Sequence, residues 1–282
     1  MASKILLCIL FVGVQSEVLT VHNYHMNIGV PRAINLMNSE LMTRIVGGSQ
    51  VTTPTSFPFQ AGIIATLTTG FTSICGGTLL SNTKVLTAAH CWWDGQSQAR
   101  LFTVVLGSLT IFSGGTRIET SRIVVHPNWN TNEITHDIAM VTIARVSFTN
   151  NIQSIPIPDL ADINHNFAGA SAVVSGYGKT SDGQGSFPTT TSLHQTTVQV
   201  ITNAVCQKSF DITLHGSHLC TNGQGGVGSC DGDSGGPLTT IRNNRRTVIG
   251  VVSFGLGDRC QSGYPSVYTR VTAFLTWIQA NL

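Results

Sequence analysis

Three short motifs contain the side chains that could together activate a hydroxyl group. The run Gly232 to Pro237 reads Gly-Asp-Ser-Gly-Gly-Pro, and its glycines allow a sharp turn that exposes Ser234 and aims successive N–H groups at one point. His90 follows a β-type run, and Asp137 opens an apolar one. Serine, histidine and aspartate are the residues that hydroxyl catalysis requires, because histidine accepts the proton and the carboxylate fixes the histidine tautomer.

Each motif also has an ordinary structural interpretation. A glycine-rich turn can be only a turn, a lone histidine is more often structural, and an aspartate before a strand can cap or close a turn. The three residue types in one chain indicate catalysis more strongly than any one of them does. His136, next to Asp137, is interpreted as a structural or surface residue.

The elements that must position these residues are predicted to be short β-strands. From Ile45 onward, apolar runs recur between turn signals, and the 29 glycines favour an all-β barrel or sandwich. Residues 155–169, where prolines interrupt the pattern, are the expected linker between two halves. Helices are expected at 203–210 and 272–282, the second with Thr272 as a candidate N-cap. The expected strands are 59–67, 84–88, 101–106, 117–125, 138–143, 170–174, 196–201, 248–254 and 267–271.

The N-terminus is typical of an exported precursor. Lys4 precedes the apolar run Ile5 to Val14, and small residues follow, so residues 1–16 are predicted to be a signal peptide. A membrane anchor is disfavoured because the run is half of the ~20 residues that a spanning helix needs. Residues 17–44, which lack cysteine and a clean hydrophobic period, are interpreted as a propeptide that ends at Arg44.

Composition excludes some function classes. Charged residues make up 10% of the 282 residues and the formal net charge is +2, so the chain offers little electrostatic attraction to nucleic acid or to an anionic membrane. The densest basic run, Arg242 to Arg246, is interpreted as a solvated hairpin tip. We therefore expect a soluble, exported protein that binds neither nucleic acid nor membranes.

Six cysteines remain once Cys8 leaves with the signal peptide. An even number in an exported chain indicates disulfides, although six cysteines allow fifteen connectivities. Zinc binding is disfavoured, because no Cys-x-x-Cys or His-x-x-x-His pair is present. The six are Cys75, Cys91, Cys206, Cys220, Cys230 and Cys260.

Five motifs together resemble the chymotrypsin-like serine proteases, in that family's order. They are Ile45-Val46-Gly47-Gly48, Thr87 to Cys91, Asp137 to Met140, Gly232 to Pro237 and Ser253-Phe254-Gly255. The resemblance extends from Ile45 to Leu282 and is greatest to invertebrate digestive chymotrypsins and collagenase-like enzymes. It implies an all-β fold of two six-stranded antiparallel β-barrels, at about 45–160 and 161–271, followed by a C-terminal helix at 272–282.

The resemblance also implies roles for individual residues. Ser234 would be the nucleophile, His90 the general acid and base, and Asp137 the residue that orients His90. The oxyanion hole would be formed by the N–H groups of Gly232 and Ser234. The implied disulfides join Cys75 to Cys91, Cys206 to Cys220, and Cys230 to Cys260.

Activation by proteolysis follows from the same resemblance. Cleavage after Arg44 by a trypsin-like protease would free the α-amino group of Ile45. In the family this cation pairs with the acid before the nucleophile, here Asp233, and an unpaired buried carboxylate would be costly. The secreted form is therefore expected to be an inactive zymogen.

The specificity pocket is expected to be uncharged. The resemblance places Gly228 and Ser229 at its base, Ser266 near its floor, and Ser253, Phe254 and Gly255 along its wall. Gly228 stands where a trypsin-like enzyme has an acid, so cleavage after large apolar or aromatic residues is predicted. Elastase-like or collagenase-like specificity is the alternative. Asp231, next to the oxyanion hole, was expected to disfavour acidic substrate neighbours.

The remaining expectations concern partners and location. No cofactor and no metal are expected, and calcium is disfavoured because the corresponding loop offers only Ser108 and a lone Glu119. Expected partners are protein or peptide substrates, the activating protease and protein protease inhibitors, with a monomer in the gut lumen as the predicted state. A non-catalytic homologue and a cascade protease are the competing interpretations. The intact motifs disfavour the first, and the absence of a further module before the protease domain disfavours the second.

Overall fold

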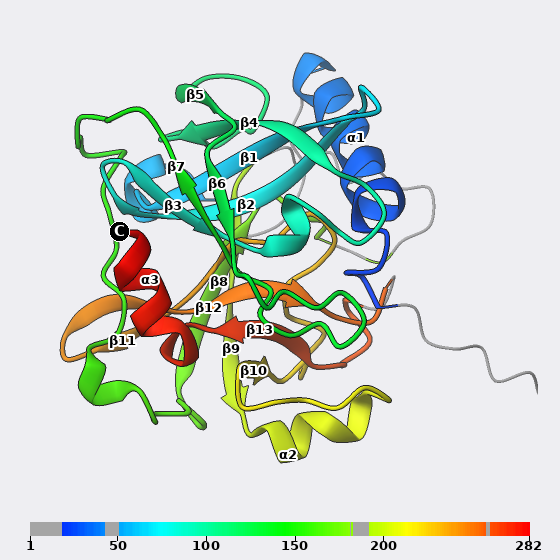
Figure 1. The fold of residues 1–282 in the computed structure, drawn as a ribbon, viewed down its shortest axis with the longest axis vertical. Helices are drawn as coiled ribbons and strands as arrows, with labels where there is room; N and C mark the ends of the chain where they lie inside the picture. Colours follow the sequence, from blue (N-terminus) through cyan, green and yellow to red (C-terminus); the bar gives the residue numbers. More distant parts are fainter. Residues whose placement is uncertain (1–18, 43–50, 181, 183–191, 258–259) are drawn as a thin grey trace, which may run out of the picture.

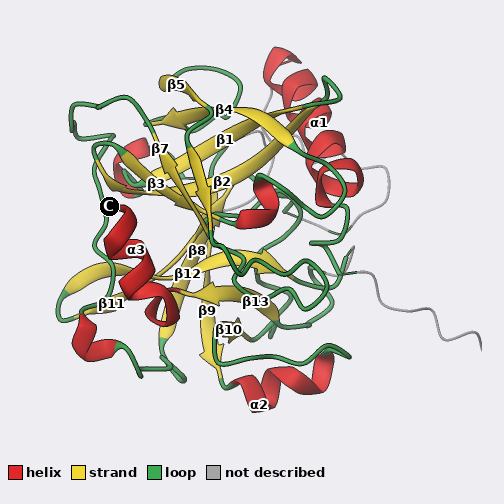
Figure 2. Ribbon diagram, in the orientation of Figure 1, coloured by secondary structure: helices red, strands yellow, loops and turns green. Residues whose placement is uncertain are grey.

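Two antiparallel sheets form the framework of the fold, with short helices at their edges (Figures 1 and 2). The computed structural model describes residues 19–42, 51–180, 182, 192–257 and 260–282. Every strand of the first sheet lies between residues 60 and 142, and every strand of the second lies between residues 171 and 270. The predicted linker, residues 155–169, lies in the connection between the two sheets and contains one 3₁₀ turn, Leu160–Asp162.

The first sheet has seven strands in the order β5-β4-β1-β2-β3-β7-β6, where six were expected. Only Ser121 and Arg122 separate β5 from β6, so one bent segment borders both ends of the sheet and the sheet curls into a barrel-like shape. The expected strand 117–125 is this segment, interrupted at its bend. The strands are β1 (Gln60–Leu67), β2 (Thr72–Ser81), β3 (Lys84–Thr87), β4 (Ala99–Leu106), β5 (Thr116–Thr120), β6 (Ile123–Val125) and β7 (Ala139–Thr142).

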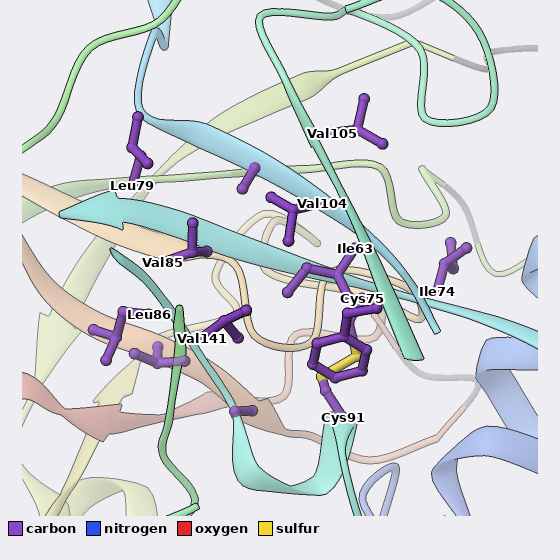
Figure 3. Packing of buried hydrophobic residues seen from close by; sticks show 14 of the residues in the cluster. Ile63, Ile74, Cys75, Leu79, Val85, Leu86, Cys91, Val104, Val105 and Val141 are labelled. Atoms are coloured by element: carbon purple, nitrogen blue, oxygen red, sulfur yellow. A yellow bond between two sulfur atoms is a disulfide. The ribbon is translucent and has the colours of Figure 1, made fainter. Parts of the chain in front are cut away.

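The core of the first sheet is built from β-branched and leucine side chains on facing strands. Ile63, Val85 and Val104 are fully buried and lie around the disulfide between Cys75 and Cys91 (Figure 3). Burial of this apolar surface supplies the main driving force for folding, about 25 cal/mol per Å². The disulfide ties β2 to the 3₁₀ turn Ala89–Cys91, which contains His90.

The second sheet is a closed barrel of six strands, as expected, in the order β10-β13-β12-β11-β8-β9. Its hairpin β11–β12 turns at Asn243 and Asn244, with φ angles of 50° and 59°, so Arg242 to Arg246 do form a hairpin tip. The strands are β8 (Ser171–Gly176), β9 (His194–Ile201), β10 (His218–Thr221), β11 (Pro237–Arg242), β12 (Arg245–Phe254) and β13 (Ser266–Arg270).

Three strands were not predicted: β2, β10 and β11. The strand β2 contains the pair Gly76-Gly77, and β11 begins at Pro237, both of which are usually read as strand breakers. Proline is tolerated in β11 because it is the first residue of the strand. The four residues of β10, beginning at His218, give too short a pattern to recognise.

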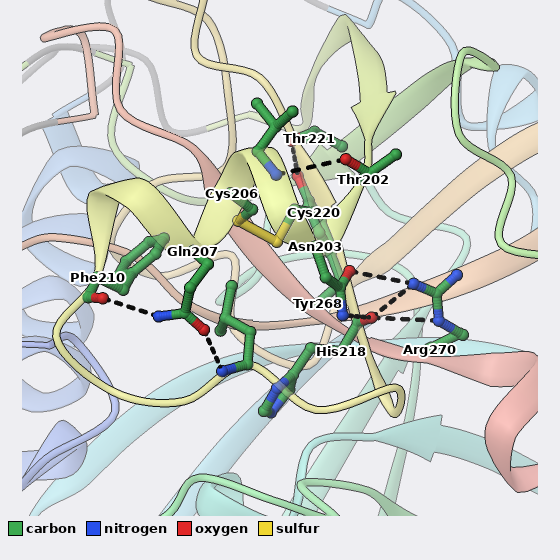
Figure 4. Close-up of a disulfide and its surroundings, with 12 residues drawn as sticks. Thr202, Asn203, Cys206, Gln207, Phe210, His218, Cys220, Thr221, Tyr268 and Arg270 are labelled. Carbon is green, nitrogen blue, oxygen red and sulfur yellow. Dashed lines mark hydrogen bonds between the residues drawn. A yellow bond between two sulfur atoms is a disulfide. The ribbon is translucent and has the colours of Figure 1, made fainter.

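Both predicted helices exist but are shorter and less regular than expected. The helix α2 (Asn203–Cys206) continues as a 3₁₀ turn to Ser209, and the disulfide between Cys206 and Cys220 fixes it to β10 (Figure 4). The helix α3 (Leu275–Asn281) follows a 3₁₀ turn, Val271–Phe274. The prediction that Thr272 is an N-cap was wrong, because Thr272 lies inside that turn and its hydroxyl donates to the carbonyl of His165.

Residues 19–42 contain an unexpected helix, α1 (Val30–Met42), which follows a π-helical turn at His25–Gly29. The helix packs beside β2 and is drawn in blue in Figure 1. Val30, Ala33 and Leu36 are buried and join the core of the first sheet. Their three-residue spacing is a helical signal, but it spans only two turns and therefore did not stand out in the sequence.

The third disulfide joins Cys230 to Cys260, so the cysteines pair as the resemblance implies. Within the described part of the chain, no helix has the length and apolar character needed to cross a membrane.

Candidate active site

His90 and Asp137 form a buried hydrogen-bonded pair from two neighbouring segments of the first sheet. His90 lies in the 3₁₀ turn after β3, and Asp137 lies two residues before β7, which pairs with β3. His90 Nδ1 is 2.7 Å from Asp137 Oδ2, and the backbone N–H of His90 donates to Oδ1 at 2.9 Å. Two contacts to one carboxylate fix both the position and the ring orientation of His90, with Nδ1 as the donor.

The second sheet also holds Asp137. Ser253 donates its hydroxyl proton to Asp137 Oδ2 at 2.6 Å, and Thr269 donates to the Asp137 carbonyl at 2.7 Å. Burial alone would raise the pKa of Asp137, but the ring and backbone N–H of His90 and the Ser253 hydroxyl outweigh burial and hold the pKa below its ordinary value. Asp137 is therefore an anion in the folded protein. Thr269 was not identified from the sequence, because its hydroxyl acts across strands far apart in the chain.

The turn that carries Ser234 is held between the two sheets. Gly232 and Gly235 have φ angles of 99° and 81°, in the region that favours glycine. Gly76 on β2 donates its N–H to the Ser234 carbonyl at 2.7 Å. A Cβ atom on Gly76 would lie 2.8 Å from the Gly236 Cα, so glycine at 76 is what allows the strand and the turn to approach this closely.

The N–H groups of Gly232 and Ser234, the expected oxyanion hole, donate to no acceptor in the described part of the chain. Both residues are on the turn that the geometry above fixes. Two fixed N–H groups beside a serine hydroxyl can stabilise negative charge that develops on a carbonyl oxygen.

Asp233 is buried and pairs with backbone donors. Its carboxylate accepts hydrogen bonds from the N–H of Gly178 at 2.8 Å and of Cys230 at 2.9 Å. Burial raises the pKa of Asp233 to about 6, and these donors and the nearby Arg32 only partly oppose that effect. A cavity of about 330 Å³ borders the carboxylate. The partner predicted for Asp233, Ile45, lies outside the described residues, as does Arg44.

The expected specificity pocket lies next to Ser234. Ser229, Ser253, Phe254, Gly255 and Ser266 line one cavity, whose volume is about 30 Å³. Gly228, expected at the base of this pocket, instead lines the cavity at Asp233. A Cβ atom on Gly228 would lie 2.8 Å from Ser266 Oγ, so the space between the two residues is narrow, whereas one on Gly255 would meet nothing within 4 Å.

Asp231 also lines this cavity, but it forms an ion pair with Lys179 at 2.7 Å and is itself buried. The sequence predicts that this charge disfavours acidic neighbours in the substrate. The ion pair compensates the charge within the protein, so that interpretation loses its basis. His136 fits its structural interpretation, since it stacks on His126 with ring centroids 4.8 Å apart.

Two groups of side chains in the described residues are close enough to share a metal ion. They are Cys75, His90 and Cys91, and Asp182, Cys230 and Cys260. All four cysteines are in disulfides, so neither group offers a thiolate and each retains one ordinary ligand.

Residues 19–42 contribute to this site, which the sequence did not reveal. The Tyr24 ring lies against the His90 ring, with centroids 4.7 Å apart, and Thr20, Tyr24 and Ile28 line the cavity at the specificity pocket. Among the described residues, none forms a hydrogen bond with His90 Nε2.

Comparisons with known proteins agree with this arrangement. The sequence model of the trypsin family, described as "Trypsin", matches residues 45–278. A collagenase of Hypoderma lineatum is 36% identical over 239 residues, which are 84% of this chain and 87% of that protein. A brachyurin of Leptuca pugilator is 36% identical over 84% of this chain and 98% of that protein, and a chymotrypsin of Phaedon cochleariae is 35% identical over 88% and 86%. A solved collagenase structure superposes with a TM-score of 0.75, at 35% identity over 84% of this chain and 98% of the other.

Proposed function

Because the chain belongs to the trypsin family of serine proteases, we propose that it is a secreted digestive endopeptidase that cleaves after large apolar or aromatic residues. The observation that carries the proposal is the hydrogen-bonded pair of His90 and Asp137 beside the glycine-rich turn of Ser234. That combination supplies a base, the residue that orients it and a serine nucleophile.

In this mechanism Ser234 Oγ attacks the scissile carbonyl while His90 Nε2 accepts the hydroxyl proton. Asp137 stabilises the imidazolium that forms, and His90 then returns the proton to the leaving amine. The N–H groups of Gly232 and Ser234 bind the oxyanion of the tetrahedral intermediate. Water next attacks the acyl group on Ser234, with His90 again as the base, and releases the second product.

Activation proceeds by cleavage after Arg44 and binding of the new α-ammonium of Ile45 to Asp233. Two observations support this step. The pKa of Asp233 is raised to about 6 by burial, so a cation that arrives beside the carboxylate is stabilised, and a cavity of about 330 Å³ borders it. Residues 1–16 would direct export before this cleavage.

Specificity for large apolar residues is supported by the uncharged pocket. Gly228 provides no carboxylate, and the acid that lines the cavity, Asp231, is already paired with Lys179. Collagenase-like or elastase-like cleavage is the second candidate. It is favoured by the narrow space between Gly228 and Ser266 and by the collagenase relatives.

The first experiment compares peptides that differ only in the residue before the scissile bond. The protein is cleaved with immobilised trypsin, its Ile45 terminus is verified, and kcat/KM is measured. Peptides with Phe, Tyr or Leu should be cleaved at least about 100-fold faster than those with Arg or Lys, since no free acid pairs with a basic side chain. A preference for Ala or Val would support the elastase-like alternative.

The matched control is Ser234→Ala, cleaved and purified in the same way. Its kcat/KM should fall by about 10⁴-fold or more, because the nucleophile is lost while the fold is kept. A preference for Arg or Lys would refute the proposed pocket. Absence of turnover in wild-type protein with a verified Ile45 terminus, after residues 19–42 have been removed by gel filtration, would refute the enzyme and favour a non-catalytic homologue.

A further inference from the structure

We propose that residues 19–42 inhibit the protease domain by binding in its active-site cleft. The segment would stay bound through non-covalent contacts even after cleavage has separated it from the protease domain. The proposal rests on the proposed function, since the cleft that residues 19–42 occupy is the proposed catalytic one. It adds a binding partner for that cleft, an apolar segment anchored by one arginine.

The segment begins by pairing with the wall of the specificity pocket. Leu19 forms an antiparallel bridge with Leu256, and the N–H of Thr20 donates to the Gly255 carbonyl at 3.2 Å. In return, the N–H of Gly255 donates to the Thr20 hydroxyl at 3.0 Å. An extended peptide that docks on a strand edge uses the same kind of hydrogen bonds. The segment therefore occupies backbone groups that a substrate strand would need.

Tyr24 then fills the space beside the proposed catalytic residues. Its side chain is fully buried, its ring packs edge-on against His90, and its hydroxyl donates to the Ile74 carbonyl at 2.8 Å. Burial raises the pKa of the Tyr24 phenol, and a side-chain hydrogen bond with Ser234 opposes this shift. Tyr24 and Ser234 also line the same cavity, so the phenol ring contacts the proposed base and lies beside the proposed nucleophile.

Arg32 on α1 fixes the segment over the turn of Ser234. Its guanidinium donates to the Tyr177 carbonyl at 2.8 Å and to the Gly178 carbonyl at 2.9 Å, and the residue is only 4% exposed. Its Cγ lies 3.0 Å from the position that a Cβ atom on Gly232 would take. The arginine therefore lies against Gly232, one of the two residues of the proposed oxyanion hole, and brings a positive charge near Asp233.

Further contacts anchor both ends of the helical part. The Nδ1 atom of His25 lies 2.8 Å from the Ser73 hydroxyl, and the backbone N–H of His25 donates to the Asp94 carboxylate. At the other end of α1, Glu40 accepts hydrogen bonds from the N–H groups of Ile111 and Phe112 at 3.0 Å. These contacts, with the buried apolar face of α1, extend the interface well beyond the cleft itself.

The geometry explains why the segment would inhibit without being cut. After Thr20 the backbone turns, with the N–H of His22 bonded to the Leu19 carbonyl, and it becomes helical at His25. Attack by a nucleophile requires a peptide carbonyl aligned at about 3 Å from the hydroxyl and the oxyanion donors. A phenol ring lies beside Ser234 here, so the group next to the nucleophile has no scissile bond.

None of these contacts involves residues 43–50, and residues 19–42 contain no cysteine. Binding should therefore not require the covalent connection to Ile45. Cleavage after Arg44 removes only the tether, so an activated molecule would remain inhibited until the segment dissociates or is degraded.

The test adds a synthetic peptide of residues 19–42 to the trypsin-cleaved enzyme after its own segment has been removed by gel filtration. We expect competitive inhibition, with KM raised and kcat unchanged. In the peptide, Tyr24→Ala should raise the inhibition constant by about 30-fold or more, as for a buried aromatic anchor. Ile34→Ala is the matched control, because Ile34 is on the exposed face of α1 and its loss should change inhibition by less than about threefold.

A second measurement separates this proposal from the proposed function. Fluorescein-labelled peptide 19–42 is titrated with cleaved Ser234→Ala protein, and its anisotropy reports binding without any catalysis. Binding that is weakened by Tyr24→Ala and not by Ile34→Ala supports the inference even if the wild-type protein has no turnover. Active wild-type enzyme that the peptide neither binds nor inhibits would overturn it. Equal effects of the two substitutions would overturn it as well.

Discussion

At the scale of single residues, two buried aspartates near the site have opposite properties. Asp137 accepts hydrogen bonds from His90 and Ser253 and faces a ring that can become cationic, so its pKa lies below the ordinary value. Asp233 has two backbone donors and no direct ion pair among the described residues, so burial dominates and its pKa rises to about 6. The environment of Asp137 stabilises its carboxylate anion. The environment of Asp233 does not, so the α-ammonium group of Ile45 would stabilise that carboxylate after cleavage.

The Asp233 carboxylate should therefore make the uncleaved chain less stable as the pH rises. A folded pKa of about 6 against 3.8 means that its contribution is fully present below about pH 4 and is lost as the pH passes 6. Two pKa units correspond to about 3 kcal/mol. In an uncleavable Arg44→Gln background, Asp233→Asn should cancel this loss, so the difference between variant and parent in urea unfolding should grow in the variant's favour from pH 4 to pH 7.

The Arg44→Gln protein must be compared with and without Asp233→Asn, because other carboxylates also titrate between pH 4 and pH 7. Their effects are common to both proteins and cancel in the difference. If the two unfolding free energies stay parallel from pH 4 to pH 7, Asp233 is already stabilised by a partner in the uncleaved chain, and the proposed activation step loses its driving force.

At the scale of elements, the strand β2 and the turn of Ser234 act as one unit. The Gly76 N–H bonds to the Ser234 carbonyl, and the close approach of Gly76 to Gly236 leaves no room for a side chain. The neighbouring Gly77 points into the core, where a Cβ atom would meet the side chains of Val85 and Ile63. Glycine is therefore required at these two adjacent positions for different reasons, the approach of the turn at Gly76 and the packing of the core at Gly77.

Gly76→Ala should impair catalysis more than stability. The new Cβ would meet the Gly236 backbone at 2.8 Å, so the turn must shift, and a displacement of about 1 Å costs about 100-fold in rate. Gly77→Ala is the control, since its Cβ would meet the side chains of Val85 and Ile63 most closely and would not touch the turn of Ser234. Overpacking of this kind costs about 1–3 kcal/mol of stability. The kcat of cleaved protein, normalised by active-site titration, and the Tm measure the two effects.

The expected pattern is a low kcat for Gly76→Ala and a lowered Tm with normal kcat for Gly77→Ala. If Gly76→Ala retained wild-type kcat, the position of the turn would not depend on its contact with β2.

At the scale of the whole molecule, the site exists only because two sheets meet. His90 and Asp137 come from the first sheet, Ser234 precedes β11 of the second, and Ser253 on β12 reaches Asp137 across the boundary. The segment 19–42 contacts both sheets, through the core of the first and through Gly255 in the second. A small relative movement of the sheets would therefore separate the proposed catalytic groups and weaken the proposed inhibitory contacts.

The disulfides should contribute to this architecture in different ways. Replacing Cys206 and Cys220 by alanine opens a loop of 14 residues between α2 and β10, which should cost about 3 kcal/mol and lower the Tm with kcat unchanged. Replacing Cys75 and Cys91 should cost a similar amount and also lower kcat, because Cys91 is adjacent to His90. Calorimetry with the same peptide assay distinguishes the two, and equal kcat in both variants would contradict the second expectation.

The sequence by itself determined the chemistry and most of the strands. The motifs around His90, Asp137 and Ser234 predict the elements that hold them, because the residue types and the backbone freedom that such a site needs are local properties. Apolar runs likewise located ten of the thirteen described strands, because nine runs were expected and the run 117–125 forms two strands, β5 and β6. The strands β2, β10 and β11 were not predicted, because glycine, proline or short length interrupts their local pattern. Pairing with neighbouring strands is what makes these segments extended.

The tertiary structure alone decided which distant residues meet. Thr269 reaches Asp137 from 132 residues away, and the Asp231 charge, read from the sequence as facing the substrate, is compensated by Lys179. The largest addition is the segment 19–42, whose buried residues on α1, Val30, Ala33 and Leu36, repeat over only two turns. The roles of Tyr24 and Arg32 are visible only in the structure, where they pack against His90 and Gly232. Such a contact depends on two segments that are distant in the sequence, so neither segment reveals it alone.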